Sequence, residues 1–244
     1  MIPYIRRNSI LELIKSRDII YMEELAETLG VSLSTARRDL HALAKDGEIV
    51  LLRGGAAKLK SGSYDLPVNK KKHIHTDEKE RIGKRAAELV SDGDVIYIDS
   101  GTTAATMVPY LDKSNITVVT SNILVVNELI RMGISCIILG GDIILELESV
   151  VGSITEKMLD SMYFDKAFIG TNGFSERGGV STCDAREARK KEMAKDNARE
   201  VYVLADSSKA NRRAFYRAFS IDECTFITDE VCDILEARGN YILA

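Results

Sequence analysis

The chain has 244 residues, a net charge of −4, and 45% hydrophobic residues with only 3 prolines. This composition supports a sizeable core and argues against disorder, and no apolar run reaches the roughly 18–20 residues that a membrane span needs. Residues 1–7 lack the apolar core of a signal peptide, and the four cysteines lack zinc-ligand spacing, so we expect a cytoplasmic protein with reduced cysteines.

Two short helices are predicted first, over residues 6–17 and 21–30. Each carries apolar residues at helical spacing on one face. Gly30 closes the second pattern, and a glycine there can adopt the left-handed conformation that ends a helix. The side chains expected to face inward are Ile10, Leu11, Ile14, Met22, Leu25, Ala26 and Leu29.

A third helix is predicted from Ser32, whose hydroxyl can cap its first turn, to the Asp46-Gly47 pair. Short polar and basic side chains cover its outer face, which suits a DNA major groove because Arg can donate two hydrogen bonds to guanine. Taken alone, a solvated helix with an Arg pair explains the same residues equally well. The residues of its apolar face are Ala36, Leu40 and Leu43.

The neighbours of this helix favour the DNA-binding interpretation. Two helices joined by a tight glycine-containing turn, the second one basic outside, form the helix-turn-helix pattern. A strand over residues 48–53 and the Gly54-Gly55 turn then predict the hairpin of a winged helix, whose Arg53, Lys58 and Lys60 would touch the DNA backbone. The candidate DNA contacts are Ser32, Ser34, Thr35, Arg37, Arg38, His41 and Arg53.

A polar stretch without periodicity, residues 60–76, is the expected linker between a DNA-binding domain (1–59) and a sensor domain (77–244). Charge divides in the same region. Residues 1–85 carry 17 Lys and Arg against 12 Asp and Glu, or +5, so the remainder sums to −9, as expected for a basic DNA-binding head on an acidic body. His73 and His75 lack a third ligand nearby, so we expect no metal and no cofactor.

Strands and helices alternate beyond the linker. Near-continuous apolar strands between helices predict an α/β fold, with a mostly parallel sheet and helices on both faces. The expected helices cover residues 76–90, 102–111, 123–132, 153–162 and 187–197. The expected strands cover residues 95–99, 116–120, 135–139, 166–169, 200–205 and 224–228.

Four polar loops follow strands of this sheet, at the edge where such folds bind ligands. Residues 99–103 offer an anion free N–H groups, a helix dipole and hydroxyls, although ordinary helix capping explains them too. The loops at 120–122, 170–173 and 206–209 complete a predicted phosphate-binding pocket, with Lys209 as a point charge and Asp206 as an acceptor for a sugar hydroxyl. The candidate ligand-binding residues are Asp99, Ser100, Gly101, Thr102, Thr103, Thr120, Ser121, Asn122, Asn172, Asp184 and Lys209.

Between the third and fourth loops, Glu187 and Lys190 fit two interpretations equally well. They are spaced as a surface i, i+3 ion pair, and they also lie where a pocket would be.

With these residues in hand, the chain resembles the DeoR family of bacterial transcriptional regulators over essentially its whole length. The resemblance implies a winged helix-turn-helix followed by a sensor domain similar in fold to ribose-5-phosphate isomerase and CoA-transferase-like proteins. It also implies a repressor that oligomerises, binds operators near sugar-catabolic genes and releases them when a phosphorylated sugar binds. The matching motifs are Glu24-Leu-Ala26, Val31-Ser32, Thr35-Ala-Arg-Arg-Asp-Leu40, Gly54-Gly-Ala56, Asp99-Ser-Gly-Thr-Thr103, Thr120-Ser-Asn122, Gly140-Gly141, Gly170-Thr-Asn-Gly173 and Asp206-Ser-Ser-Lys209.

Two alternatives stay open at this point. One is a sugar-phosphate isomerase with an appended DNA-binding head, in which Asp206 and Lys209 would act as acid–base groups. The other is an activator in place of a repressor. The expected partners are double-stranded operator DNA and a small sugar phosphate, with no membrane. A homodimer is the minimum assembly, because two half-sites need two recognition helices.

Overall fold

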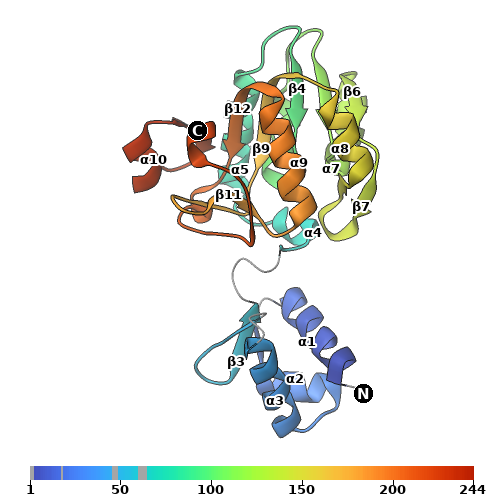
Figure 1. The fold of residues 1–244 in the computed structure, drawn as a ribbon, viewed down its shortest axis with the longest axis vertical. Coiled ribbons are helices and arrows are strands. Elements are labelled where there is room, and N and C mark those ends of the chain that lie inside the picture. The colour runs from blue at the N-terminus through green and yellow to red at the C-terminus, as the bar shows by residue number, and fades with distance from the viewer. Residues whose placement is uncertain (1–2, 18, 46–48, 60–64) are drawn as a thin grey trace. The chain divides into compact units, whose positions relative to one another are not determined.

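The computed structural model describes residues 3–17, 19–45, 49–59 and 65–244. The chain divides into two compact units, residues 1–64 and 65–244 (Figure 1). Of the expected linker, residues 60–64 lie outside the described part of the chain. The remainder belongs to the second unit, where Val68 is buried in the short helix α4 (Val68–Lys71) and Lys71 pairs with Asp65 (Nζ to Oδ2, 2.8 Å).

The first unit contains the three predicted helices and the predicted hairpin. Sequence reasoning missed strand β1 (Ile19–Tyr21), which pairs antiparallel with β3 and gives the sheet order β1-β3-β2. A three-residue strand is too short to show a period, so only its pairing defines it. The expected helix end at residues 46–47 and strand start at residue 48 lie outside the described residues. The other elements are α1 (Pro3–Arg17), α2 (Met22–Leu29), α3 (Leu33–Lys45), β2 (Ile49–Leu51) and β3 (Ala56–Leu59).

The helices of the first unit pack through the apolar faces that their spacing predicts. Ile10 and Ile14 of α1, Leu25 of α2 and Leu40 of α3 lie in one fully buried cluster. Gly30 ends α2 in the expected left-handed conformation, with φ of 62°, and this turn brings α3 back against α2.

A buried ion pair joins α1 to α3. The Arg6 Nε lies 2.5 Å from the Asp39 Oδ2, and both side chains are almost fully buried. Arg7 adds a longer contact, 3.4 Å from its Nε to the Asp39 Oδ1. Because removing either charge of a buried pair leaves the other uncompensated, this pair fixes the placement of α3 on α1.

The second unit is built on a seven-stranded sheet in the order β15-β14-β12-β9-β4-β5-β6. Every neighbouring pair is parallel, which confirms the predicted α/β sheet. All the strands therefore end at one edge of the sheet, and the predicted polar loops gather there. The strands are β4 (Val95–Ile98), β5 (Thr117–Thr120), β6 (Ser135–Ile138), β9 (Phe164–Gly170), β12 (Ala198–Leu204), β14 (Thr225–Thr228) and β15 (Tyr241–Leu243).

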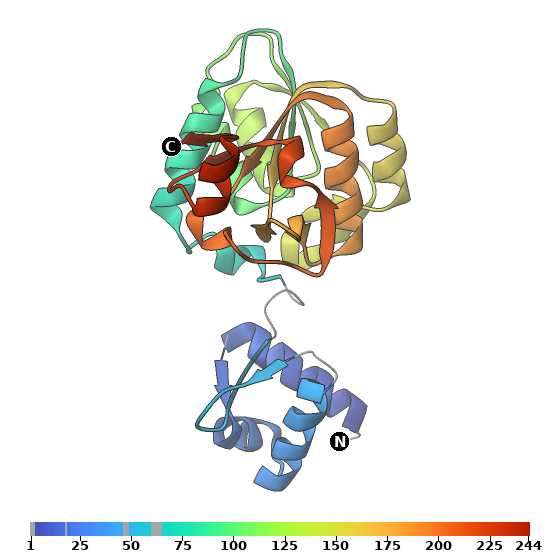
Figure 2. The same cartoon turned by 60° about the vertical axis from the view of Figure 1, so that its left-hand side comes forward.

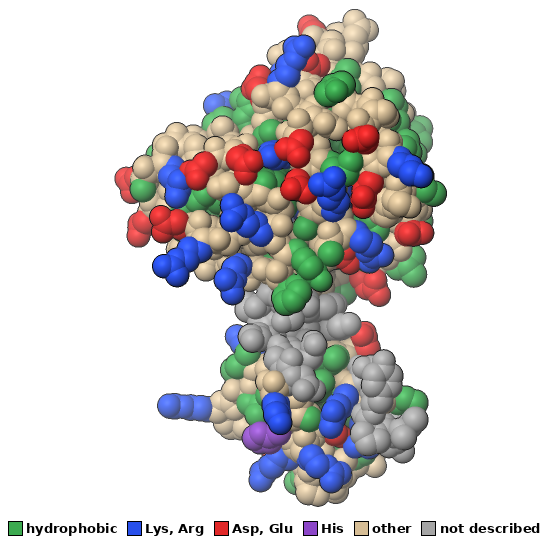
Figure 3. Space-filling model, in the orientation of Figure 1, with side chains coloured by type: hydrophobic (Ala, Val, Ile, Leu, Met, Phe, Trp, Pro, Cys, Tyr) green, Lys and Arg blue, Asp and Glu red, His purple; other side chains and the backbone are tan. Residues whose placement is uncertain are grey.

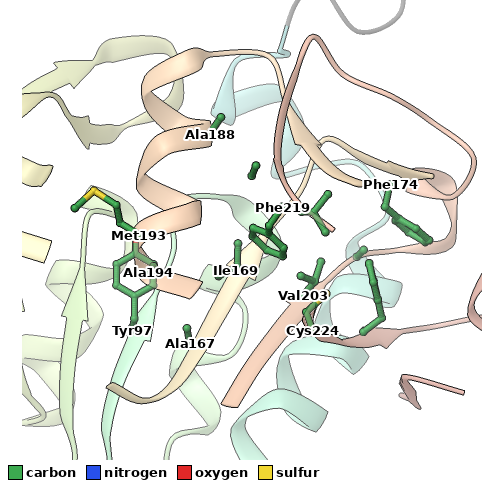
Figure 4. Close-up of a cluster of buried hydrophobic side chains, with 14 of the residues drawn as sticks. Tyr97, Ala167, Ile169, Phe174, Ala188, Met193, Ala194, Val203, Phe219 and Cys224 are labelled. Atoms are coloured by element: carbon green, nitrogen blue, oxygen red, sulfur yellow. The ribbon is translucent and has the colours of Figure 1, made fainter. Parts of the chain in front are cut away.

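Helices cover both faces of this sheet (Figures 1 and 2). On one face lie α5 (Thr76–Glu88), α6 (Thr102–Ala105) and α7 (Ile123–Met132), and on the other lie α8 (Ser153–Asp160) and α9 (Ala185–Asp196). Alternate residues of each strand point into the two hydrophobic cores, which lie on opposite faces of the sheet. Tyr97 packs on the α9 side, while Ile96 and Ile98 pack on the α5 side. Figure 4 shows Tyr97 with strand residues beside Met193 and Ala194 of α9.

Gly83 allows α5 to lie directly against the chain that follows α6. A Cβ at position 83 would stand 2.6 Å from the carbonyl carbon of Thr106 and 2.8 Å from the backbone nitrogen of Met107. No larger residue fits this approach without a shift of the backbone, so the two segments are held in close contact.

The expected helix over residues 102–111 is wrong in its second half. After α6 ends at Ala105, the chain forms a separate 3-10 turn over Val108–Tyr110. Pro109 has no N–H to continue the helical ladder. The Thr106 hydroxyl instead donates to the carbonyls of Thr103 and Lys79, both at 2.7 Å.

Several short elements beyond the main sheet also escaped prediction, because strands of three or four residues leave no periodic signal. A hairpin pairs β7 (Asp142–Ile144) with β8 (Ser149–Val151). A second, antiparallel sheet contains β10 (Gly173–Ser175), β11 (Gly179–Thr182) and β13 (Tyr216–Phe219). Helix α10 (Asp233–Arg238) precedes the last strand, β15.

Candidate functional site

The outward face of α3 presents the predicted DNA contacts. The N–H of Thr35 donates to the Ser32 Oγ at 3.3 Å, which confirms Ser32 as the cap of this helix. Thr35 itself is half-buried. The exposed side chains of this face and its flank are Ser32, Ser34, Arg37, Arg38, His41 and Lys45.

Arg37 and Arg38 have their guanidinium donors available. Neither side chain has an ion-pair or hydrogen-bond partner within the described ranges. The neighbouring carboxylate of Asp39 is buried and held by Arg6. α3 can therefore present two unpaired guanidinium groups to phosphates or base edges.

The wing follows α3 as the sequence predicts. β2 and β3 pair antiparallel, and Gly54 and Gly55 take left-handed conformations at their turn, with φ of 82° and 79°. Arg53 is exposed at this turn and Lys58 is exposed on β3, whereas Lys60 lies outside the described residues. Figure 3 shows Lys and Arg side chains together with a histidine on the visible face of the first unit.

In the second unit, Asp99 directly follows β4, and its buried carboxylate connects several segments. Its Oδ2 accepts a hydrogen bond from the Gly170 N–H at 3.0 Å and forms an ion pair with Lys191. Its Oδ1 accepts from the Tyr97 hydroxyl at 3.4 Å. Because both oxygens of the Asp99 carboxylate are engaged in these contacts, Asp99 holds the loop after β4 against β9 and α9.

The polar side chains of the loop after β5 also form hydrogen bonds within the protein. The Thr120 Oγ1 donates to the Ile98 carbonyl at 2.6 Å. The Asn122 Nδ2 donates to the carbonyls of Asp99 and Gly101 at 3.1 and 3.2 Å, and Ser121 lies 3.3 Å from the Tyr97 hydroxyl. All three side chains are fully buried, so they support residues 99–103 from behind.

A cluster of buried charges lies beside this loop, and it shows that the surface interpretation of Glu187 and Lys190 is wrong. The Lys190 Nζ donates to the Glu187 Oε1 at 2.7 Å, to the Ser149 Oγ at 2.7 Å and to the Ser100 Oγ at 2.9 Å. Glu187 also accepts from the Ser149 and Ser100 hydroxyls, at 2.5 and 2.9 Å. Sequence reasoning missed Lys191, the second ammonium of the cluster, 3.5 Å from Glu187.

These charges stay ionised inside the protein because they compensate one another. Burial alone would raise the pKa of Glu187, but the ammonium groups of Lys190 and Lys191 hold it well below its usual range. Burial would likewise lower the pKa of Lys191, and the carboxylates of Asp99 and Glu187 raise it instead.

A cavity of about 490 Å³ opens between α5 and the residues that follow β4. Thr102 lines it, together with Thr106, and Lys79 supplies its buried cation. Sequence reasoning missed Lys79, although its spacing of three, four and seven residues from Ile82, Gly83 and Ala86 places it on the inward face of α5.

Burial and neighbouring charges shift the pKa of Lys79 in opposite directions. Burial lowers the pKa of Lys79 to about 8, while the carboxylate of Asp206 acts to raise it and the ammonium of Lys209 acts to lower it. The Lys79 Nζ donates to the Lys71 carbonyl at 2.5 Å. A lysine with such a pKa is mostly charged at pH 7 and loses its charge as the pH rises past the pKa.

Asp206 offers an acceptor without a partner. Its Oδ1 caps the turn that follows, accepting from the Ser208 N–H at 3.1 Å. Its Oδ2 is buried and makes no hydrogen bond with any described residue. A buried carboxylate oxygen left without a donor is costly, so it is suited to a ligand hydroxyl.

Of the remaining predicted ligand residues, Lys209 lies near the cavity, whereas Asn172 and Asp184 form hydrogen bonds within the protein. Lys209 is half-buried and close enough to Lys79 to affect its pKa. Asn172 accepts from the Thr182 hydroxyl at 2.8 Å. Asp184 caps α9 through the Arg186 N–H at 2.8 Å, and the Arg186 guanidinium holds the pKa of Asp184 below its ordinary value.

Comparison with known families accounts for both units. Residues 6–62 match the DeoR-like helix-turn-helix domain, and residues 74–230 match the DeoR C-terminal sensor domain. The chain is similar to the HTH-type transcriptional regulator FruR of Bacillus subtilis, with 35% identity over 92% of this chain and 90% of that one. It is also similar to the glycerol-3-phosphate regulon repressor of Escherichia coli, with 34% identity over 88% and 86% of the two chains.

Solved structures show weaker likeness. Ribose 5-phosphate isomerase A of Methanocaldococcus jannaschii aligns over 56% of this chain and 55% of that one, with 22% identity and a TM-score of 0.42. The eIF2B delta subunit of Chaetomium thermophilum aligns over 84% and 74%, with 16% identity and a TM-score of 0.48.

The sequence relatives named above carry the names of transcriptional regulators, which favours a regulator over the isomerase alternative. Within the described ranges, no helix has the length and hydropathy that crossing a bilayer requires. The two matched domains, in this order and over nearly the whole length, show that the chain belongs to the DeoR family of DNA-binding transcriptional regulators.

Proposed function

We propose that this protein is a repressor that grips operator DNA with α3 and the β2–β3 wing, and releases it when a phosphorylated sugar enters the cavity of the second unit. The observation that supports the proposal is that Arg37 and Arg38 of α3 have no partner among the described residues. The other unit of the chain contains a cavity whose lining includes Lys72 and Lys79. Relatives support it: one is named a glycerol-3-phosphate regulon repressor and another a lactose phosphotransferase system repressor.

Within the cavity, the phosphate would bind beside Thr102 of the loop 101–103, with Lys79 in the cavity wall and Lys209 near Lys79 as the cations. The unpartnered Oδ2 of Asp206 would accept a hydrogen bond from a sugar hydroxyl. Asn172 and Asp184 would lie near the ligand, although neither lines the cavity. Asp99, Thr120, Ser121 and Asn122 would position this loop from beneath, since their polar groups are already bonded to the protein.

The operator test is a gel shift on the DNA upstream of the gene itself, with and without a panel of phosphorylated sugars. A retarded band that one sugar phosphate abolishes is the expected result. A protein that ignores this DNA, or holds it equally well with every sugar, contradicts the proposal. Increased reporter output after deletion of the gene distinguishes a repressor from an activator.

Removing the ligand contacts together is expected to weaken effector binding about 30-fold. The variant is Thr102→Ala with Lys209→Ala, which deletes one hydroxyl and one charge facing the phosphate, each worth about 1 kcal/mol. Calorimetry with the effector found in the gel shift measures the loss. Lys157→Ala, an exposed lysine on α8, is the control. An unchanged affinity in the double variant would refute the placement of the phosphate.

Effector affinity is also expected to fall about tenfold between pH 7 and pH 9. The pKa of Lys79 is about 8, so its ammonium is mostly present at pH 7 and mostly lost at pH 9. The ligand phosphate stays doubly charged over this window, because its second pKa is about 6. Calorimetry at the two pH values measures the change, and Lys79→Met should abolish it. A parent affinity independent of pH would show that Lys79 does not face the phosphate.

A further inference from the structure

We propose that the β6 edge of the seven-stranded sheet is a docking surface for a second copy of this chain. β6 is the last strand on its side, and β5 is the one strand of the sheet that pairs with it. The backbone groups on its outer side have no strand partner among the described residues. Such an edge is a template on which another strand can pair.

The side chains of this edge are uncharged and, apart from Ser135, not polar. Residues 134–141 contain no charged residue and no proline, the two devices that most often keep an edge strand from pairing. Ile137 and Ile138 are neighbours on β6 and point to opposite faces of the sheet, yet both are exposed. The end of the sheet is thus uncovered on both faces, which is unusual for large apolar side chains.

Further exposed apolar residues flank the strand on both sides. Ile130 lies on α7, Ile154 on α8, and Ile143 with Leu145 on and just after β7. Gly140, which follows β6, lies close to α8, since a Cβ there would be 3.7 Å from the Cγ2 of Ile154. We call Ile130, Ile137, Ile138, Ile143, Leu145 and Ile154 the edge patch. Figure 3 shows hydrophobic side chains along the margin of the second unit where Figure 1 places β6 and β7.

The size of the edge patch fits a stable interface. Its six side chains are between 41% and 77% exposed. With roughly 200 Å² for a fully exposed Ile or Leu residue, they present roughly 650 Å² per copy, so two copies would bury up to about 1,300 Å². This area is within the range of specific complexes and above that of ordinary crystal contacts.

A second copy of this chain is the occupant that the geometry favours. Antiparallel pairing of β6 with β6 of the partner, around a two-fold axis, lets the same apolar surface meet itself and closes the assembly at two. Pairing of β6 with the opposite edge, β15, would leave a free edge at each end and build an open filament. If the proposed operator binding holds, this dimer also supplies the two recognition helices that paired half-sites need.

The first experiment compares two edge-strand variants by light scattering and sedimentation, without DNA or effector. The parent should have twice the 27.0 kDa mass of the chain. Ile138→Lys should halve that mass or raise the dissociation constant at least tenfold, because two ammonium groups would face each other in an apolar interface. Leu243→Lys, at an exposed position on β15, is the matched control and should stay dimeric.

Hydrogen exchange on the parent protein tests the surface without any substitution. Exchange in residues 134–141 should become faster when the protein is diluted below the dissociation constant, while exchange in residues 241–244 should not change. A parent that is monomeric at all concentrations overturns the proposal, and so does a dimer that Leu243→Lys disrupts but Ile138→Lys does not. Concentration-independent exchange at β6 overturns it even if Ile138→Lys fails to fold. Since no DNA is present, failure here leaves the operator test intact.

Discussion

Replacing Lys190 with methionine is expected to lower the free energy of unfolding by about 3–5 kcal/mol. The Lys190 ammonium is almost fully buried and bonds to Glu187, Ser100 and Ser149. Methionine has a similar volume but no charge, so Glu187 would keep a buried negative charge with one of its two ammonium partners removed. Urea unfolding of the second unit, followed by circular dichroism, measures the loss.

Two variants of the same helix serve as controls for Lys190→Met. Arg189→Met removes an exposed cation whose surface pair with Glu192 spans 2.6 Å, and it should cost less than about 0.5 kcal/mol. Adding Glu187→Met to Lys190→Met removes both charges and should recover part of the lost stability. If Lys190→Met proved as stable as Arg189→Met, the buried cluster would not contribute as described.

Arg38→Ala is expected to weaken specific operator binding at least about 30-fold. A bidentate arginine–base contact is worth about 1–3 kcal/mol, and the proposed dimer on two half-sites would lose two of them. Arg38 is exposed and has no partner in the described part of the chain, so its removal leaves the fold and the effector pocket unchanged. Fluorescence anisotropy on operator and scrambled DNA, at one salt concentration, separates the specific loss from the general one.

The matched control for Arg38→Ala is Arg17→Ala. Arg17 is also an exposed arginine of the first unit, but it pairs with Glu24 and lies on α1, away from the outward face of α3. It should change operator affinity little, and calorimetry should give both variants the parent's effector affinity. Operator binding by Arg38→Ala as tight as that of the parent would mean that α3 does not enter the groove in the orientation assigned to it.

The sequence predicted the first unit well because local signals dominate there. The spacing of Ile10 and Ile14, the glycine after α2 and the serine before α3 each act within a few residues. β1 was the exception, since it is a strand only through its pairing with β3. The parallel sheet was predictable for a similar reason, as each buried strand is a continuous apolar run between helices.

The sheet edge that carries the candidate loops was predictable, whereas the ligand-binding residues remain a prediction. The loops after β4, β5, β9 and β12 do meet at one edge, because parallel strands all end on the same side. Residue type does not show which polar groups are already bonded, so Asn122 seemed as available as Thr102. The buried cluster was hidden for another reason: α9 is rich in charge all round, and only the tertiary fold buries Lys190 and Lys191.

The missing side chain at Gly83 has a mechanical consequence. Backbone lies against backbone between α5 and residues 106–107, so these two segments cannot approach further or slide past each other without a collision. The cavity lining also includes Lys72, which directly follows α4. A ligand in the cavity therefore meets a wall that cannot close further at residues 106–107.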